Sequence, residues 1–176
     1  GFLLEALVHA RRLRPEVLLM VAGEGPAMAD LKAQVGVLGL TDAVHFIGYL
    51  DRDNELPDCY AAADVFVFAS RTETQGLVLL EAMAAGLPVI ALAEMGTIDI
   101  LAPGRGAFCP PPEPKAFGEM LGHFLNHSDA WRHLAAEAPV FAAEWSDAAM
   151  AGRLATLYHQ LPGLKIASER PLTATA

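Results

Sequence analysis

Short apolar runs alternate with amphipathic stretches along most of the chain. Apolar residues at helical spacing predict a helix over residues 1–13, which Pro15 ends. Continuous apolar runs are typical of strands covered on both faces, and they predict such strands at 17–22, 43–48, 64–70, 87–92 and 106–110. Further helices are predicted at about 26–38, 54–63, 77–86, 114–126, 129–143 and 146–161.

This alternation predicts the fold class. Strands and helices that follow one another in this way form a doubly wound α/β domain with a parallel, Rossmann-like sheet, here followed by C-terminal helices. We expect one domain over residues 1–162 and a flexible tail over 163–176. Ligands of such domains lie beyond the carboxyl ends of the strands. Loops that contain glycine fit this position at 23–26, 70–76 and 93–97.

Composition narrows the classes of partner and compartment. The chain is 53% hydrophobic and 19% charged, with a net charge of −9, which argues against nucleic acid as a partner. No run approaches the roughly 18 uncharged residues of a membrane span, and the first residues lack the basic region of a signal peptide. Cys59 and Cys109 stand far apart in apolar settings, which favours buried, reduced thiols in a cytoplasmic protein.

The loop at 70–76 and the helix after it carry the most informative side chains. A helix that begins near Leu77 presents free N–H groups that suit phosphate, and Gly76 lets a ligand approach the backbone. Glu73 and Glu81 flank this helix start; carboxylates repel phosphate but accept hydrogen bonds from vicinal diols. The pattern therefore predicts a ligand made of sugar, diphosphate and ribose. The alternative is that Glu73 caps the helix and Glu81 lies on its surface.

The same stretch resembles a known family. Glu73 and Glu81 are separated by seven residues, and "EAMAAGLPVIA" follows from Glu81. This pattern is similar to the C-terminal domain of the family 4 retaining glycosyltransferases, which have the two-domain GT-B fold. Further similar stretches are "LLMVAGEGP" (18–26), "VHFIGYL" (44–50) and "YAAADVFVFAS" (60–70). The resemblance covers about residues 1–162.

The resemblance implies a role for each matching residue. Glu73 is the implied catalytic-site residue, which contacts hydroxyls of the donor sugar, and Glu81 holds the ribose hydroxyls. Among the other implied donor-binding residues, Leu50 lies against the base and Gly23 belongs to the loop that faces the interdomain cleft. Four further residues surround the diphosphate and the sugar: Thr74, Gln75, Gly76 and Leu77. In this family, which includes bacterial enzymes, the donor is a nucleoside-diphosphate sugar such as UDP-glucose. No cofactor and no metal are expected.

The resemblance also implies parts that lie outside these residues. The family has an earlier strand and loop with an arginine and a lysine, and an N-terminal domain that binds the acceptor. We therefore expect this domain to be incomplete at its N-terminal edge and inactive alone. The intact enzyme is expected to transfer a hexose, with retention, to a lipid or another envelope glycan. The acceptor domain would then bring it to the inner, cytoplasmic face of the membrane.

Other interpretations remain open from the sequence. A nucleotide-sugar epimerase of the same fold is one, and a non-catalytic donor-binding subunit that pairs with a separate acceptor domain is another. "DRD" at 51–53 imitates a metal-binding motif, but its position favours a solvated loop and helix cap. His123 and His127 are four residues apart without a third ligand, which favours surface histidines. Asp99 stands where the family often has a glutamate, and its role stays undefined.

Overall fold

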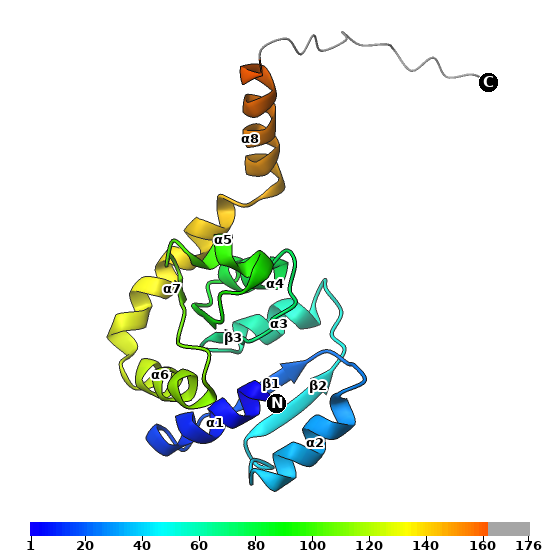
Figure 1. Ribbon diagram of the computed structural model, residues 1–176, viewed down its shortest axis with the longest axis vertical. Coiled ribbons are helices and arrows are strands. Elements are labelled where there is room, and N and C mark those ends of the chain that lie inside the picture. Colours follow the sequence, from blue (N-terminus) through cyan, green and yellow to red (C-terminus); the bar gives the residue numbers. More distant parts are fainter. Residues whose placement is uncertain (162–176) are drawn as a thin grey trace, which may run out of the picture. The chain divides into compact units, whose positions relative to one another are not determined.

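The computed structural model describes residues 1–161, so the predicted tail at 163–176 lies outside the described residues. Within 1–161 each paired strand runs parallel to its neighbour, and helical segments separate the strands along the chain (Figure 1). This arrangement confirms the predicted α/β class with parallel pairing. Residues 1–143 form one compact unit, and a second unit begins at Glu144.

The strands lie in two parallel sheets. β1 pairs with β2, and β4 lies between β3 and β5. Each strand falls inside the apolar run that predicted it and is shorter than that run. In chain order they are β1 (Leu19–Ala22), β2 (Val44–Gly48), β3 (Phe66–Phe68), β4 (Val89–Ala91) and β5 (Ala107–Phe108).

The helices also follow the predicted pattern, with one addition. The sequence predicts a loop at 93–97, whereas the structure has a 3₁₀ turn, η1, that leads into the short helix α5. Segments of three and four residues are too short to show a helical period. The helical elements are α1 (Phe2–Leu13), α2 (Met28–Val37), α3 (Glu55–Ala61), α4 (Leu77–Ala84), η1 (Met95–Thr97), α5 (Ile98–Leu101), α6 (Pro114–Asn126), α7 (Ser128–Ala143) and α8 (Asp147–Gln160).

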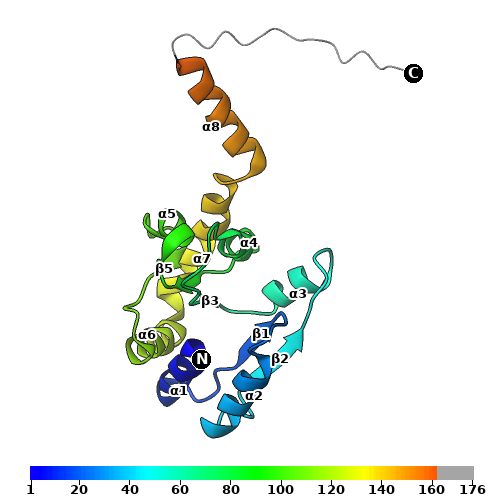
Figure 2. The same cartoon turned by 45° about the vertical axis from the view of Figure 1, so that its right-hand side comes forward.

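The core is most complete around β4. This strand is fully buried, and its Ile90 packs in one cluster with Phe117 of α6 and Ala10 of α1. The helices α1 and α6 lie side by side (Figures 1 and 2). Their close approach depends on Gly118, because a Cβ atom added there would lie 2.0 Å from the carbonyl oxygen of Ala6. Tight packing of this kind tolerates little extra volume.

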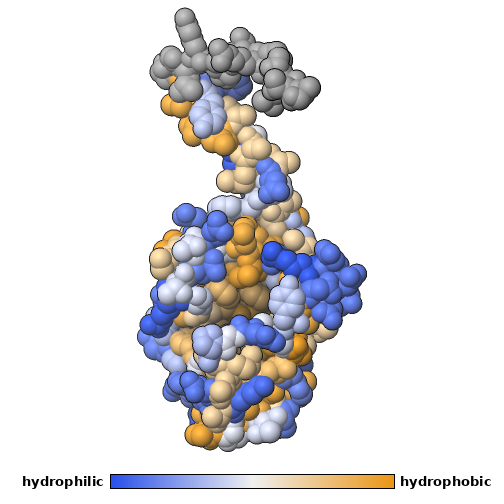
Figure 3. All heavy atoms as spheres, turned by 90° about the vertical axis from the view of Figure 1, so that its right-hand side faces the viewer, coloured by the Kyte–Doolittle hydropathy of each residue, from blue (hydrophilic) through white to orange (hydrophobic). Residues whose placement is uncertain are grey.

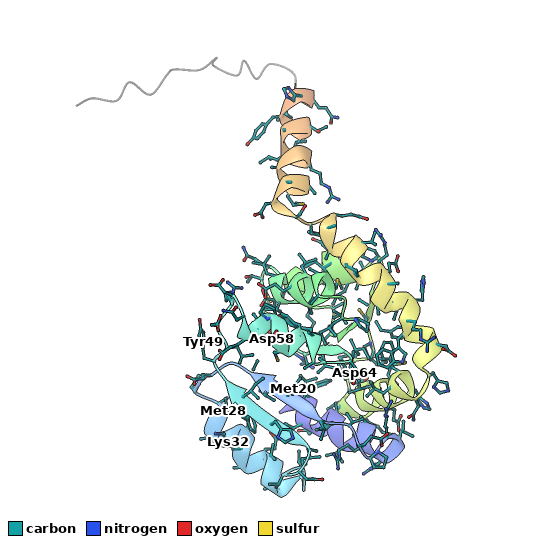
Figure 4. All side chains as sticks on the ribbon, turned by 180° about the vertical axis from the view of Figure 1, so that it is seen from behind. Met20, Met28, Lys32, Tyr49, Asp58 and Asp64 are labelled. Carbon is teal, nitrogen blue, oxygen red and sulfur yellow. The ribbon has the colours of Figure 1, made fainter. Side chains whose placement is uncertain are left out.

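A groove separates the two sheets. Within residues 1–161, β1 and β3 are not hydrogen-bonded to each other, and a mostly apolar hollow of about 1330 Å³ lies between them. We call this hollow, whose two walls are residues 18–22 and 64–70, the inter-sheet groove. Figure 3 shows this face of the molecule hollowed, with apolar side chains inside the hollow. Figure 4 labels Met20 and Asp64, which belong to the two walls.

The inter-sheet groove corrects two predictions about burial. The runs at 17–22 and 64–70 were expected to form strands covered on both faces, but β1 alternates between half-buried and exposed residues and β3 is only half-buried. The physical reason is that the edges of both strands face the groove instead of another strand. The prediction of buried thiols is also wrong for Cys109, which is exposed and follows the edge strand β5; Cys59 is half-buried.

The second unit contributes α8. The Ser146 hydroxyl caps this helix by accepting a hydrogen bond from the Ala149 N–H at 3.3 Å. Several of its apolar side chains are exposed, among them Met150, Leu154 and Leu157. No helix within residues 1–161 has both the length and the apolar character that crossing a lipid bilayer requires.

Candidate functional site

The start of α4 provides the central backbone geometry of the site. Gly76, the N-cap residue, has a left-handed conformation with φ of +71°. A Cβ atom there would lie 2.7 Å from Cδ1 of Ile100, so conformation and contact both favour glycine. The first N–H groups of a helix have no partner within it. Those of Leu77 and Val78 can therefore meet an anion at the positive end of the helix dipole.

The Glu73 carboxylate holds the loop that precedes this helix. Its Oε1 atom accepts hydrogen bonds from the N–H groups of Gln75 and Gly76, both at 2.9 Å. These bonds, first that from Gln75, hold the pKa of the Glu73 carboxyl below its usual range. Both donors precede Leu77, the first residue of α4, and among the described residues no side chain caps this helix by a hydrogen bond. The carboxylate therefore holds the loop before the helix and does not cap the helix itself. A carboxylate has about four acceptor sites, so positions remain for ligand hydroxyls.

A second set of contacts, made by the backbone of η1, holds the same loop. The Gly96 N–H donates to the Glu73 carbonyl oxygen at 3.0 Å. A Cβ atom on Gly96 would lie 2.0 Å from the carbonyl oxygen of Thr74, so the backbones of η1 and of this loop are in direct contact. A reciprocal capping box between Glu94 and the buried Thr97 holds η1 in turn. The loop before α4 is therefore rigidly placed.

Glu81 lies on α4, and both of its carboxylate oxygens have partners. Arg52 places Nη2 at 2.6 Å from Oε1, and the Tyr60 hydroxyl donates to Oε2 at 3.4 Å. Burial, and next the charge of Glu81, raise the pKa of Tyr60 to about 12, so this hydroxyl keeps its proton at neutral pH. With one contact on each oxygen, Glu81 retains capacity for hydroxyl groups of a ligand.

The structure brings part of the predicted set together. Three predicted residues line the inter-sheet groove although they come from different elements. Gly23 follows β1, Leu50 follows β2, and Glu81 lies on α4. The remaining predicted residues form a second group around the start of α4 and do not line the groove: Glu73, Thr74, Gln75, Gly76 and Leu77. The start of α4 and the groove are joined through α4 itself.

Sequence reasoning missed Arg52 and Tyr60. The interpretation of 51–53 as a loop is confirmed: Asp51 Oδ1 accepts hydrogen bonds from the N–H groups of Asp53 and Asn54, each at 2.9 Å, within this loop. The predicted helix cap is wrong, because the N-cap residue of α3 is Asn54 and no side chain of the described residues caps this helix by a hydrogen bond. Arg52 has its partner 29 residues further along the chain. No local pattern of residues signals a contact over such a distance.

The histidine pair on α6 makes a local contact. His127 Nδ1 lies 2.7 Å from the His123 carbonyl oxygen, one turn earlier. Within residues 1–161 no three or more His, Cys, Asp or Glu side chains gather in a group that could hold a metal ion.

Comparison with known proteins gives a family. The family described as "Glycosyl transferases group 1" matches residues 2–140. The alpha-monoglucosyldiacylglycerol synthase of Streptococcus pneumoniae is 44% identical over 88 residues, which are 50% of this chain and 20% of that protein. Further curated relatives are covered over 18% to 42% of their own length, so the chain spans less than half of the length of these relatives.

Solved structures share the fold. HepE from Anabaena, in complex with UDP and glucose, has a TM-score of 0.77 at 24% identity, over 91% of this chain and 44% of that one. The C-terminal domain of LpcC from Francisella tularensis, a glycosyl transferase group 1 family protein, has a TM-score of 0.71 at 26% identity. That match covers 81% of this chain and 76% of the LpcC domain. The fold is therefore that of the C-terminal half of GT-B chains.

Proposed function

The chain belongs to the group 1 glycosyl transferases, and on that basis we propose that it binds a nucleoside-diphosphate sugar, as the donor domain of an enzyme that transfers a hexose to an acceptor. The start of α4 carries this proposal, because its open amides lie between the carboxylates of Glu73 and Glu81 in sequence. The helix start accepts the diphosphate, and the carboxylates accept hydrogen bonds from hydroxyls on either side of it. HepE, which shares the fold, is solved in complex with UDP-glucose, a ligand of this class.

Each residue of the site has a task in this proposal. Glu81, one turn into α4, binds the ribose diol, and Glu73 meets hydroxyls of the donor sugar. Leu50, half-buried at the end of the β2 segment, lies against the base. The loop that contains Gly23 faces the cleft in which the acceptor arrives. Thr74, Gln75, Gly76 and Leu77 surround the diphosphate and the sugar.

The chemistry that we propose needs no metal and no cofactor. As the bond between the sugar and the diphosphate breaks, negative charge develops on the departing diphosphate, and the amides at the start of α4 stabilise it. The configuration of the sugar is retained. The name of the Streptococcus pneumoniae relative supports a lipid or another envelope glycan as acceptor. An acceptor of this kind places the intact enzyme at the cytoplasmic face of a membrane.

The inter-sheet groove supports the proposal that residues 1–162 are an incomplete donor domain. The edges of β1 and β3 face this groove, and both belong to parallel sheets. A parallel strand from outside these residues would pair with both edges and join the two sheets into one. An N-terminal domain would then supply the acceptor site, as it does in a two-domain GT-B enzyme.

Calorimetric titration of the chain with UDP-glucose, UDP and GDP tests the donor site. We expect binding by the wild type, and we expect Glu81→Ala to weaken it by about 1–3 kcal/mol, the loss typical of hydrogen bonds to charged groups. EDTA should leave the affinity unchanged. Glu119→Ala is the matched control, because it removes a half-exposed carboxylate on α6, away from the site.

The outcomes separate the parts of the proposal. Binding that Glu81→Ala and Glu119→Ala reduce equally would remove the assignment of Glu81 to the ribose. A large loss in EDTA would replace the metal-free chemistry with a metal-dependent one. No binding of any nucleotide at millimolar concentration would contradict the donor site on this chain.

A further inference from the structure

Both partners of Glu81 come from the segment between β2 and β3. Arg52 lies in the loop between β2 and α3, Tyr60 lies on α3, and Glu81 lies on α4; all three line the groove. From this geometry we propose that Arg52 is a positioning residue of the donor site: it neutralises and orients the Glu81 carboxylate, so that the ribose and the diphosphate can bind beside each other. This inference rests on the proposed function.

The contact has little value for the stability of the fold. The Arg52 side chain is 72% exposed and that of Glu81 is 33% exposed. Exposed ion pairs contribute between about 0 and 1 kcal/mol to stability, because water screens the charges and ordering the long side chains costs entropy. A distance of 2.6 Å between Nη2 and Oε1 nevertheless defines one orientation of the carboxylate. An effect on ligand binding is therefore the larger consequence of this pair.

The position of Glu81 makes its charge matter for a phosphate ligand. Glu81 lies four positions after Leu77, the first residue of α4. At about 1.5 Å of rise per residue, this is roughly 6 Å along the helix axis. Unscreened, the carboxylate would repel a diphosphate at the helix start, since charges interact over a Debye length of about 8 Å at physiological ionic strength. Arg52 cancels this repulsion without blocking the remaining acceptor positions of Glu81.

Tyr60 completes the arrangement from the buried side. Its ring packs edge-on against Phe66 of β3, with centroids 5.9 Å apart and planes at 66°. The ring is thereby fixed, and its hydroxyl, which keeps its proton at neutral pH, donates to Oε2 of Glu81. Arg52 and Tyr60 thus each hold one oxygen, and they leave the lone pairs between them for a diol.

A double-mutant cycle distinguishes action through Glu81 from direct contact with the nucleotide. The variants are Arg52→Gln, Arg52→Lys, Glu81→Gln and the double variant Arg52→Gln/Glu81→Gln, each titrated with UDP. We expect Arg52→Gln to weaken UDP binding about tenfold, and Arg52→Lys, which keeps the charge, to stay within about threefold of the wild type. In the Glu81→Gln background, Arg52→Gln should change the affinity by less than about twofold.

Salt provides the readout that a purely structural role would not move. The loss in Arg52→Gln comes from repulsion by an unpaired carboxylate, so it should shrink as NaCl is raised from 50 to 500 mM. Arg132→Gln is the control, because it removes one charge from an exposed ion pair on α7 and should leave UDP binding unchanged. Circular dichroism of each variant verifies that it folds.

Three results would overturn the inference. Unchanged affinity in Arg52→Gln excludes a positioning role. A tenfold loss that persists in the Glu81→Gln background means that Arg52 contacts the nucleotide itself. Absence of UDP binding by the wild type removes the donor site and this inference with it. The first two results leave the proposed function standing, so the two failures are distinct.

Discussion

The β1–β2 pair and the β3–β4–β5 sheet are built from similar apolar runs, yet they differ in burial. Ile90 of β4 is fully buried, whereas Met20 of β1 is 39% exposed. The difference arises because β4 has a strand on each side, while β1 has one on a single side and faces the inter-sheet groove on the other. An apolar run therefore predicts a strand, but its burial depends on neighbours that the run does not specify.

The loops that follow β1 and β3 differ in how tightly their contacts hold them. The loop before α4 is fixed by the Glu73 carboxylate and by the backbone of Gly96. In the loop after β1, the Gly23 N–H donates to the carbonyl oxygen of Gly48 at 2.7 Å. A Cβ atom added to Gly25 in the same loop would meet no atom within 4 Å. Both loops contain glycine next to a helix, so glycine alone does not indicate which loop is rigid.

Truncation of one apolar side chain in each sheet should show the largest contrast. We expect Ile90→Ala to lower the free energy of unfolding by about 2–5 kcal/mol, because it leaves a cavity in a closed core. Met20→Ala should lower it by less than about 1 kcal/mol, because the side chain already contacts solvent. Urea denaturation of both variants measures this, with the exposed Val37→Ala as the baseline. Equal losses would show that β1 is as well covered in solution as β4.

An added methyl group in each loop should give an intermediate effect. Gly96→Ala forces a Cβ atom against the backbone of Thr74, at 2.0 Å, so the loop must move by more than 1 Å. We expect a stability loss of about 1–3 kcal/mol and UDP binding weakened roughly 10- to 100-fold. Gly25→Ala meets no atom within 4 Å and should change neither quantity. Thermal unfolding measures the stability of each variant, and calorimetry measures its affinity for UDP. Similar effects of the two substitutions would mean that both loops accommodate a Cβ atom equally well.

The smallest contrast is between Glu73, in the loop before α4, and Glu24, in the loop after β1, in how the loop before α4 responds to pH. The folded pKa of Glu73 lies below its unfolded value of 4.5, so its hold on the loop is present above pH 4.5 and is lost as the pH falls through the folded pKa. The amide resonances of Gln75 and Gly76 should therefore shift in one step below pH 4.5, and Glu73→Gln should abolish that step. Glu24→Gln is the matched control, because within residues 1–161 its carboxylate accepts no hydrogen bond. A step that survives in Glu73→Gln would assign the titration to another group.

The sequence predicts most of this fold because its signals are local. Pro15 ends α1, Pro114 begins α6, and Gly86 follows α4, each for a reason of backbone geometry that acts within a few residues. The turn η1 escaped prediction because it depends on a capping box between Glu94 and Thr97 in a segment too short for a period. The inter-sheet groove escaped because pairing between sheets depends on strands distant in sequence.

In the candidate site, too, local features are predictable from the sequence and long-range contacts are not. The helix start and its carboxylates are predictable, because spacing along a helix fixes where Glu81 lies relative to Leu77. The contacts of Glu81 with Arg52 and Tyr60 are not, because they join segments 29 and 21 residues apart. The two hydrogen bonds to the Glu73 carboxylate depend on loop conformation, which the residue pattern of the loop does not determine.

The facing edges of β1 and β3 also bear on how this chain behaves as a purified material. An unpaired strand edge presents a row of N–H and C=O groups to which strands of other molecules can add. Here two such edges share one apolar hollow, and the apolar side chains of Met20 and Leu18 are exposed beside them. We therefore expect concentrated solutions of this chain to self-associate. The solubility of the chain becomes a measure of how well these two edges are covered.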